Sequence, residues 1–524
     1  MTMDTLELPA HVNAAQWIVD RHVAAGRGGR TAIHFEGATW TYADFQSLVN
    51  RSGNLLRELG VEIENRVGLL MLDSPEYLAA FLGAVKIGAV PICLNTLLGP
   101  ASYEYMLNDS RAKVVIAHEE VAANLFKVRA NLRYLRHVVI LGSPPSGYLS
   151  HAELIGRATA VLDPEPRARD DWSFWAYTSG STGEPKAVMH THATLMAGTW
   201  YFPRHVMALG EADTIFCMAK LFFTYGTGLN MYMPLANGAA TVLNPRRPVP
   251  DELFRILHRY RPTIFAAVPT MYAAMLQVKD AARTYDLGSL RMCWSGGEAL
   301  PPPIYHEWRD RFGVEILELL GSSELIHGFC TTRPGMNRPG SIGVPVPGYE
   351  LRIVDDALTD VPDGKAGRLM IAGPSVFAGY ANRREKNEAT FFGKWMLSSD
   401  TVRRDGEGIY WFVGRSDDML KVGGAMVSPI EIENVLVEHP AVLEAAVIGA
   451  PDEHQLVKPK AVVVLKQGFK PGPELEAELT ALVKGRLARY KYPRWYVFVD
   501  QLPKTATGKI QRFQLRDGTL RGLG

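Results

Sequence analysis

A stretch rich in hydroxyl groups, Tyr177–Lys186, reads YTSGSTGEPK and directly follows an apolar run. Its glycines, Gly180 and Gly183, permit backbone geometry in which amide N–H groups approach an anion closely. Further phosphate donors and a positive charge come from Thr178, Ser179, Ser181, Thr182 and Lys186. A single turn of this composition is more often an ordinary polar surface turn, but the density of donors here indicates a phosphate loop.

Spacing excludes two familiar nucleotide-binding loops. A Walker loop requires glycine immediately before its lysine, where this chain has Pro185. The dinucleotide fingerprint fails as well, because Gly226 and Gly228 are followed by Met231 where a third glycine should stand. Phosphate binding at Tyr177–Lys186 must therefore use another arrangement.

Other charged residues could complete a nucleotide site. Glu324 follows a polar turn at the end of an apolar run, which is where open α/β sheets bind ligands. Asp400 could accept hydrogen bonds from both hydroxyls of a ribose, with Arg415 as a nearby donor. Taken alone, these residues also fit a solvated loop glutamate and a surface ion pair of little energetic value. Lys509 lies in a Thr/Gly-rich turn, where a lone lysine is nearly always solvated.

The elements that must hold these residues alternate through most of the chain. Strand-like runs at Arg66–Leu72 and Thr263–Val268 are each followed by a helix-like stretch, beginning at Pro75 and Thr270. Strands that alternate with helices are typical of parallel sheets covered on both faces. We therefore expect an α/β fold whose large N-terminal domain, residues 1–416, consists of parallel sheets covered by helices.

A change of pattern after Gly414 predicts a second, smaller domain. Ser428, Pro429 and Glu431 have the order of a helix N-cap, a first-turn proline and a capping glutamate. Two strand-like runs, another helix and a last strand follow, which together make a compact α+β set of domain size. We place this C-terminal domain at residues 417–524, with the boundary at Asp417.

Composition excludes several classes of protein. The 524 residues are 47% apolar and 21% charged, which is typical of a globular protein of at least two domains. The net charge of +1 gives no reason to expect nucleic acid or an anionic membrane as a partner. The four cysteines are too far apart for a metal site or a disulfide framework. Since no apolar run could span a bilayer and no secretion signal is evident, we expect a cytoplasmic protein with reduced thiols.

The order of the motifs resembles the adenylate-forming superfamily, which includes acyl- and aryl-CoA ligases, firefly luciferases and the adenylation domains of peptide synthetases. The resemblance covers roughly residues 30–515. After the hydroxyl-rich stretch come Gly296–Ala299, Gly321–Glu324, Asp400 with Tyr410–Arg415, Ser416–Asp418 with Lys421–Gly424, and Pro503–Ile510. Six motifs in the family's order are not expected by chance.

This resemblance implies an enzyme that uses ATP and Mg²⁺ to activate a carboxylic acid as an acyl adenylate. It assigns catalysis to Lys509, Glu324 and Thr178, with Glu324 also the ligand of Mg²⁺, a cation that prefers oxygen donors. It assigns ATP binding to Thr178, Ser179, Gly180, Ser181, Thr182, Gly183, Lys186, Gly297, Glu298, Ala299, Gly321, Ser322, Ser323, Asp400, Arg415 and Lys509. Lys509 would stabilise the negative charge that develops at the α-phosphate.

The resemblance further implies that the C-terminal domain is mobile. Asp417 would be the hinge about which this domain rotates after adenylation, withdrawing Lys509 from the site. The rotation would bring Lys421, Gly423 and Gly424 to the path of the thiol of coenzyme A.

Two segments, Lys220–Gly226 and Glu324–Phe329, look most like those of benzoate-type aryl-CoA ligases. They imply a pocket for one aromatic ring, with walls formed by Phe223, Thr224, Tyr225, Gly296, Ile326 and His327. At least one of Phe222 and Phe223 is expected to be a plain core residue instead. The hydroxyl of Thr224, with His327, could bond a polar ring substituent. Benzoate, 2-aminobenzoate and the hydroxybenzoates therefore all stay open as substrates.

Three positions depart from the family's pattern. Ser323 stands for a threonine, which retains the hydroxyl. Ser399 stands for a glycine beside Asp400, where it could alter a tight turn. Ala187 stands for a glycine at the edge of the hydroxyl-rich stretch, where a methyl group could narrow the motion of the loop.

Two other functions remain alternatives. A free-standing adenylation enzyme would load the phosphopantetheine thiol of a carrier protein, and the core motifs do not distinguish that thiol from coenzyme A. A regulatory module would bind nucleotide without chemistry, but it would need neither Lys509 nor Glu324. A homodimer also stays open.

Overall fold

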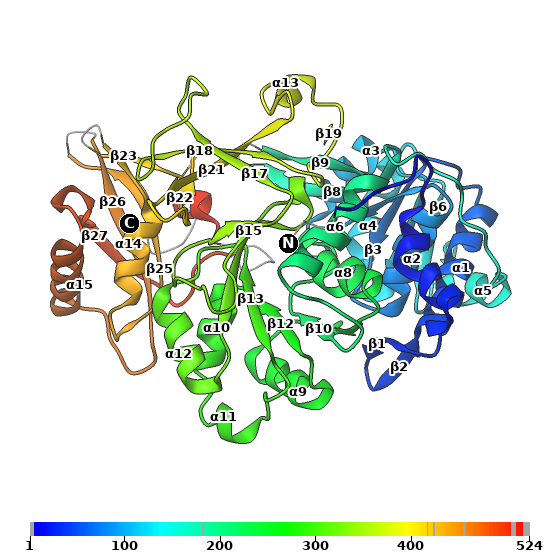
Figure 1. Ribbon diagram of the computed structural model, residues 1–524, viewed down its shortest axis with the longest axis horizontal. Coiled ribbons are helices and arrows are strands. Elements are labelled where there is room, and N and C mark those ends of the chain that lie inside the picture. Colours follow the sequence, from blue (N-terminus) through cyan, green and yellow to red (C-terminus); the bar gives the residue numbers. More distant parts are fainter. Residues whose placement is uncertain are drawn as a thin grey trace.

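The computed structural model describes residues 5–180, 183–416, 418–422, 425–453, 456–504 and 510–516. Two large sheets and their helices form most of the molecule, and the orange and red elements form a smaller unit at the left of Figure 1. The expected α/β fold, with a large region of mainly parallel sheets and a small α+β unit, is confirmed. No helix among these residues is both long and apolar enough to cross a membrane.

The first large sheet is nine-stranded, and its six central strands, from β14 to β1, run parallel to one another. Its edge strands β2, β15 and β16 pair antiparallel. In spatial order the strands are β16 (Val344–Pro345), β15 (Gly328–Thr331), β14 (Ile316–Gly321), β13 (Met292–Gly296), β12 (Ile264–Ala267), β10 (Thr214–Cys217), β11 (Ala240–Leu243), β1 (Thr31–Phe35) and β2 (Ala38–Thr41). The strand predicted at Thr263–Val268 is β12.

The second large sheet is eight-stranded and parallel except at one side, where β8, β9 and β19 pair antiparallel. Its strands are β19 (Gly379–Tyr380), β9 (Gly183–Thr191), β8 (Trp172–Gly180), β4 (Val90–Cys93), β3 (Arg66–Leu70), β5 (Val114–His118), β6 (His137–Leu141) and β7 (Leu149–Ser150). The hydroxyl-rich stretch therefore spans the turn of the β8–β9 hairpin.

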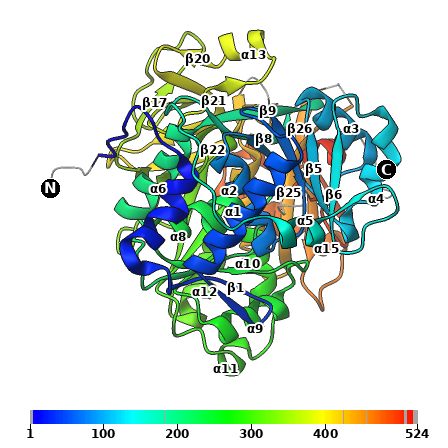
Figure 2. The ribbon, with the colours of Figure 1, turned by 90° about the vertical axis from the view of Figure 1, so that its right-hand side faces the viewer.

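Helices cover both faces of each large sheet, as the apolar pattern predicts. One apolar core joins the facing sides of the two sheets through α1 (Tyr42–Glu58), α2 (Pro75–Lys86), α6 (His192–His205) and α8 (Met233–Ala236). Within this layer α1 packs against α2 (Figure 2). The outer faces are covered by α3 (Pro100–Asp109) and α4 (Ala123–Val128) on one sheet, and by α9 (Pro250–Tyr260), α10 (Pro269–Leu276) and α12 (Pro302–Phe312) on the other.

The remaining helices of the large region are short. They are α5 (His151–Arg157), α7 (Thr224–Thr227), α11 (Ala281–Thr284) and α13 (Arg384–Glu388). All four cysteines of the chain are free and buried, as expected.

An antiparallel five-stranded sheet follows the two large sheets along the chain. Its strands are β17 (Glu350–Val354), β18 (Ala366–Ala372), β21 (Trp395–Arg404), β20 (Phe391–Phe392) and β22 (Tyr410–Arg415). The register of β21 and β22 places Asp400 directly opposite Arg415.

The small unit has its own apolar cores, separate from those of the large sheets. The N-cap predicted at Ser428 is present, because the hydroxyl of Ser428 accepts the N–H of Glu431 at the start of the first helix. Its elements are β23 (Leu420–Val422), β24 (Ala425–Val427), α14 (Pro429–Val437), β25 (Val442–Pro451), β26 (Val457–Leu465), α15 (Pro473–Arg486), β27 (Trp495–Phe498) and α16 (Arg512–Arg516). The domain boundary at Asp417, which lies outside the described residues, stays a prediction.

A buried acid supports the loop after β13 from below. Glu318 on β14 is only 4% exposed, and its Oε2 accepts the N–H of Leu300 at 3.2 Å. Burial raises the pKa of Glu318 from its ordinary 4.5 to about 8, and the Leu300 N–H opposes this rise. The side chain is therefore mostly neutral at pH 7.

Replacing Glu318 by glutamine should change how stability depends on pH. The unfolded chain releases the proton of Glu318 near pH 4.5, whereas the folded chain holds it up to about pH 8. The stability that Glu318 contributes is thus fully present below pH 4.5 and lost as the pH rises to about 8. The free energies of unfolding of wild type and Glu318→Gln, measured by thermal denaturation from pH 5 to 9, should diverge by about a few kcal/mol. Wild type should lose stability relative to the variant as the pH rises. Parallel pH profiles of the two proteins would contradict this prediction.

Candidate active site

The hydroxyl-rich stretch is a hairpin whose strands align its charged and hydroxyl residues. Thr178 on β8 lies opposite Lys186 on β9, and Tyr177 lies opposite Ala187. Ala187 is a buried strand residue whose carbonyl accepts the N–H of Ala381 at 3.0 Å. Its methyl group therefore packs within the sheet. Two residues predicted to bind phosphate, Ser181 and Thr182, lie outside the described residues.

Glu324 meets this hairpin through a tyrosine. The hydroxyl of Tyr380, on the strand β19 that pairs with β9, donates to Glu324 Oε1 at 2.9 Å. The ammonium group of Lys186 lies 6.0 Å from the centre of the Tyr380 ring. Burial and the carboxylate of Glu324 raise the pKa of Tyr380, whereas Arg415 lowers it, so Glu324, Tyr380 and Arg415 share one electrostatic environment. Our sequence analysis missed Tyr380, because it lies outside every motif.

A second contact joins the two large sheets next to Glu324. His190 on β9 is fully buried, its ring stacks on Phe174 at 4.8 Å, and its Nε2–H donates to the carbonyl of Ser323 at 2.8 Å. Burial lowers the pKa of His190 to about 4, although the bond to Ser323 opposes this fall, so the ring is neutral near pH 7. The sequence offered no signal for this role, since an isolated histidine in a strand is usually a core residue.

The turn that carries Glu324 has a strained backbone. Ile326 has a φ of +65°, which is a rare value for a β-branched residue. Its carbonyl accepts a 2.6 Å hydrogen bond from the buried hydroxyl of Tyr232, and its side chain is buried. At Gly321 a Cβ atom would lie 2.8 Å from the carbonyl oxygen of His327, so only glycine fits. Such over-determined, strained turns occur chiefly at functional sites.

Some predicted ring-pocket residues lie close together at the end of β13. The hydroxyl of Tyr225 lies 3.3–3.4 Å from the carbonyls of Ala267 and Trp294, and a Cβ on Gly296 would lie 3.3 Å from the Tyr225 ring. Gly296 thus lets this aromatic ring pack against the strand. Phe222 belongs to the buried core, as expected for one of the pair, whereas Phe223 is half-buried.

His327 uses both ring nitrogens within the protein. Its Nε2 lies 2.9 Å from the hydroxyl of Tyr349, which contacts the hydroxyl of Ser375, and its Nδ1 contacts the carbonyl of Gly328. By contrast, the half-buried Thr224 places its hydroxyl 3.2 Å from that of Ser323, at the edge of the turn before Glu324. This geometry favours Thr224 over His327 as the group that could bond a ring substituent.

The predicted ribose residues are brought together by strand pairing. Arg415 donates from Nη2 to the hydroxyl of Ser399 at 2.5 Å, and Asp400 Oδ2 accepts the hydroxyl of Ser398 at 2.7 Å. Ser399 lies within strand β21 and not in a tight turn, so the serine in place of glycine does not distort the backbone. It instead gives the guanidinium of Arg415 an additional acceptor.

The loop after β13 reaches the small unit. Gly297 has a φ of +94°, which turns the chain sharply after the strand. Next to it, Glu298 accepts the backbone N–H of Ile510 at 2.7 Å through Oε1, and Ala299 is half-buried. Ile510, the residue after Lys509, therefore lies against a residue of the predicted nucleotide site.

Several predicted residues of the small unit cannot be placed. Lys421 is exposed on β23. The predicted hinge, the two glycines of the thiol path and the catalytic lysine lie outside the described residues: Asp417, Gly423, Gly424 and Lys509.

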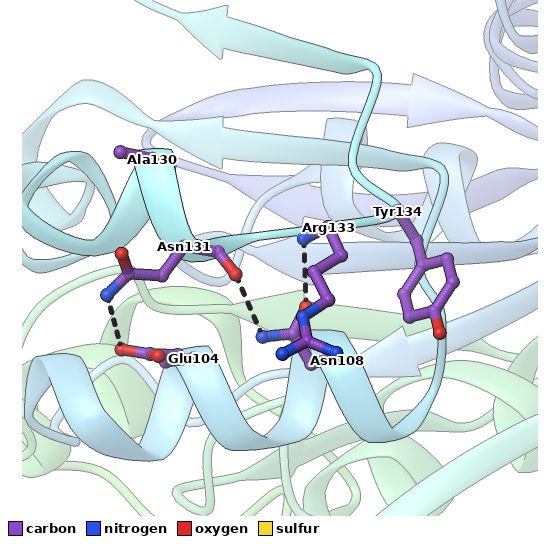
Figure 3. A pocket seen from close by; sticks show the side chains of 6 residues that line it. All are labelled: Glu104, Asn108, Ala130, Asn131, Arg133 and Tyr134. Atoms are coloured by element: carbon purple, nitrogen blue, oxygen red, sulfur yellow. Dashed lines mark hydrogen bonds between the residues drawn. The ribbon is translucent and has the colours of Figure 1, made fainter.

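A separate surface pocket of about 660 Å³ lies between α3 and the segment that precedes β6 (Figure 3). Asn131 donates to Glu104 at 3.0 Å and Asn108 donates to the Asn131 carbonyl at 3.1 Å, so these polar groups bond mainly to one another. None of its lining residues belongs to the predicted site.

Two family models and several known proteins match this chain over most of its length. The model of the AMP-binding enzyme family matches residues 20–381, and that of the AMP-binding enzyme C-terminal domain matches residues 431–509. The chain is 45% identical to a benzoate–CoA ligase of Thauera aromatica over 98% of both chains. It is 42% identical to a 4-hydroxybenzoate–CoA/benzoate–CoA ligase of Rhodopseudomonas palustris, over 98% of this chain and 95% of the relative.

Two solved structures are similar over nearly the whole chain. The anthranilate CoA ligase AuaEII, solved in complex with anthranoyl-AMP, has a TM-score of 0.94 at 43% identity, with 98% of each chain covered. A benzoate CoA ligase from Burkholderia xenovorans LB400 has a TM-score of 0.90 at 43% identity, with 96% of this chain and all of the other covered. With both family models matched and the fold shared throughout, this chain belongs to the AMP-binding enzyme family, within the adenylate-forming superfamily.

Proposed function

We propose that this protein is an ATP-dependent aryl-CoA ligase. It joins an arylcarboxylate to the AMP part of ATP, giving an aroyl (aryl-acid) adenylate and diphosphate, and then transfers the aroyl group to the thiol of CoA with release of AMP. The observation that carries this proposal is the convergence of Lys186, Tyr380 and Glu324 beside the strand pair that aligns Asp400 with Arg415. The similarity to benzoate- and anthranilate-CoA ligases supports the aryl substrate.

The first step needs electrostatic stabilisation more than proton transfer. An arylcarboxylate is already ionised at neutral pH, so its oxygen attacks the α-phosphorus without a general base. The bond to diphosphate breaks while negative charge accumulates on the phosphate oxygens. Lys186 and the donors of the β8–β9 hairpin would hold the leaving diphosphate, and Lys509 would stabilise the charge at the α-phosphate.

The residues present fit a magnesium ion that arrives with the nucleotide. Mg²⁺ is usually held by one or two carboxylates together with substrate phosphates and waters, and Glu324 is a fixed carboxylate beside the phosphate hairpin. When bound, the ion would neutralise phosphate charge. Tyr380 would keep the carboxylate of Glu324 turned toward that position through its 2.9 Å hydrogen bond.

A panel of acids tests the proposed substrate class. Diphosphate release should be faster with benzoate and 2-aminobenzoate than with hexanoate or octanoate by about 10-fold or more, because aromatic side chains such as Tyr225 and Phe223 favour contact with a flat ring over a flexible chain. The measurement is kcat/KM for diphosphate release at fixed ATP. Faster turnover of the fatty acids would overturn the aryl proposal.

Replacing Thr224 by valine separates the ring substituents. Valine keeps the shape of threonine and removes its hydroxyl, so activity with 2-aminobenzoate should fall about five-fold relative to benzoate. The ratio of kcat/KM for the two acids is the readout. An unchanged ratio would show that the hydroxyl of Thr224 does not bond the ring substituent.

Replacing Lys509 by alanine should slow aryl-adenylate formation about 100- to 1,000-fold, as removal of a preorganised transition-state donor usually does. Lys394, which is exposed and paired with Glu350 at 2.6 Å, offers a control, since Lys394→Ala removes the same charge at a residue outside the predicted site. Full adenylation by the Lys509→Ala variant would refute this mechanism, even with the family assignment intact.

The acceptor is tested separately. CoA and a carrier protein both present a phosphopantetheine thiol, and the CoA ligases among the relatives favour CoA. Supplying each acceptor to preformed aryl adenylate should give a thioester with CoA. A thioester formed only on a carrier protein would favour the free-standing adenylation enzyme.

A further inference from the structure

One carboxylate of the large region reaches the small C-terminal unit. Glu298, on the loop after β13, accepts the backbone N–H of Ile510 at 2.7 Å across 212 positions of sequence. A hydrogen bond from an amide to a carboxylate is charge-assisted, and it is shorter and stronger than a bond between neutral groups. Both residues are half-buried, so water screens the bond only in part. Because Ile510 directly follows Lys509, this contact fixes the neighbour of the predicted catalytic lysine.

Ile510 and its described neighbours are firmly attached to the small unit. Lys504 and Ile510 pair as an isolated antiparallel bridge, and the N–H of Gln511 donates to the carbonyl of Pro503 at 2.8 Å. Lys504 also donates from Nζ to Glu444 on β25 at 2.6 Å. A bond to Ile510 from the large domain therefore acts on a residue that is itself anchored in the small unit.

A largely buried arginine near Ile510 places a positive charge close to the carboxylate of Glu298. Arg512 Nη2 donates to both oxygens of Glu433, at 3.0 and 2.7 Å, and Arg512 Nη1 lies 3.9 Å from Asp418 Oδ2. Although burial opposes a charge here, the carboxylates of Glu433, Asp418 and Glu298 together raise the pKa of Arg512. Glu298 thus faces a cationic part of the small unit that is anchored beside the predicted hinge.

We propose that Glu298 is a positioning residue: by holding Ile510, the residue that follows Lys509, it tethers the C-terminal unit to the large domain during activation of the acid. This inference rests on the proposed function, in which Lys509 serves the adenylation step and leaves before the thiol attacks. A tether that acts through Lys509 serves the first half-reaction alone. A carboxylate that gripped the nucleotide would serve both half-reactions, because the aryl adenylate retains the adenosine.

The two half-reactions of the full-length enzyme, measured separately, test the tether. In a Glu298→Ala variant, single-turnover formation of benzoyl adenylate should fall about 10- to 100-fold, the usual effect of losing a hydrogen bond to a charged group. Glu298→Gln, whose amide oxygen can still accept the N–H of Ile510, should lose less. Thioester formation from synthetic benzoyl adenylate and CoA should stay within about two-fold of wild type. Glu307→Gln, at an exposed carboxylate on α12, removes the same charge and should change neither rate.

A double substitution shows whether Glu298 acts through the lysine. In a Lys509→Ala background nothing remains to be positioned, so Glu298→Ala should lower the residual adenylation rate by less than about two-fold. A full additive loss in that background, an equal loss in both half-reactions, or no loss in the single variants would each overturn the tether. Failure of the proposed function is distinct, since wild type would then form no adenylate from any aryl acid.

Discussion

The hydrogen bond from His190 to the carbonyl of Ser323 connects the two large sheets where the site is assembled. One sheet supplies the β8–β9 hairpin, and the other supplies the turn that carries Glu324. Full burial keeps His190 neutral, so its Nε2–H donates without the cost of a buried charge. The Tyr380–Glu324 bond lies beside this connection, because β19 pairs with the strand that carries His190 and Glu324 directly follows Ser323. The predicted phosphate donors of the hairpin and the carboxylate of Glu324 are thereby held in fixed positions relative to each other.

Three carboxylates around this connection differ because their surroundings differ. Glu318 lies beneath the loop after β13, where burial without a cation keeps it protonated near neutral pH. Glu324 accepts the hydroxyl of Tyr380 and remains available beside the hairpin. Glu298 extends toward the small unit and accepts a backbone amide there. The segment from the loop after β13 to the turn after β14 thus contains a structural acid, a candidate ligand of Mg²⁺ and a candidate tether, although all three are glutamates.

The departures from the family's pattern are understood from their places in the sheets. Ala187 packs inside the sheet, where its methyl group has room, and Ser399 lies within a strand and supplies an acceptor to Arg415. Ser323 keeps the hydroxyl of the usual threonine and contacts Thr224. Such substitutions look disruptive in a motif because a motif records neighbours along the chain, whereas each side chain responds to neighbours in space.

The sequence by itself determined the fold class and the main strands and helices, and it predicted a set of charged residues for a nucleotide site. Periodicity and motif order are local properties, and residues such as Glu324, Asp400 and Arg415 keep their chemistry wherever the chain places them. Only the tertiary structure decided the partners: Tyr380 on Glu324, His190 on Ser323, and Glu298 on Ile510. Those pairs join positions 56, 133 and 212 residues apart, and sheet pairing and burial, which no spacing encodes, bring them together.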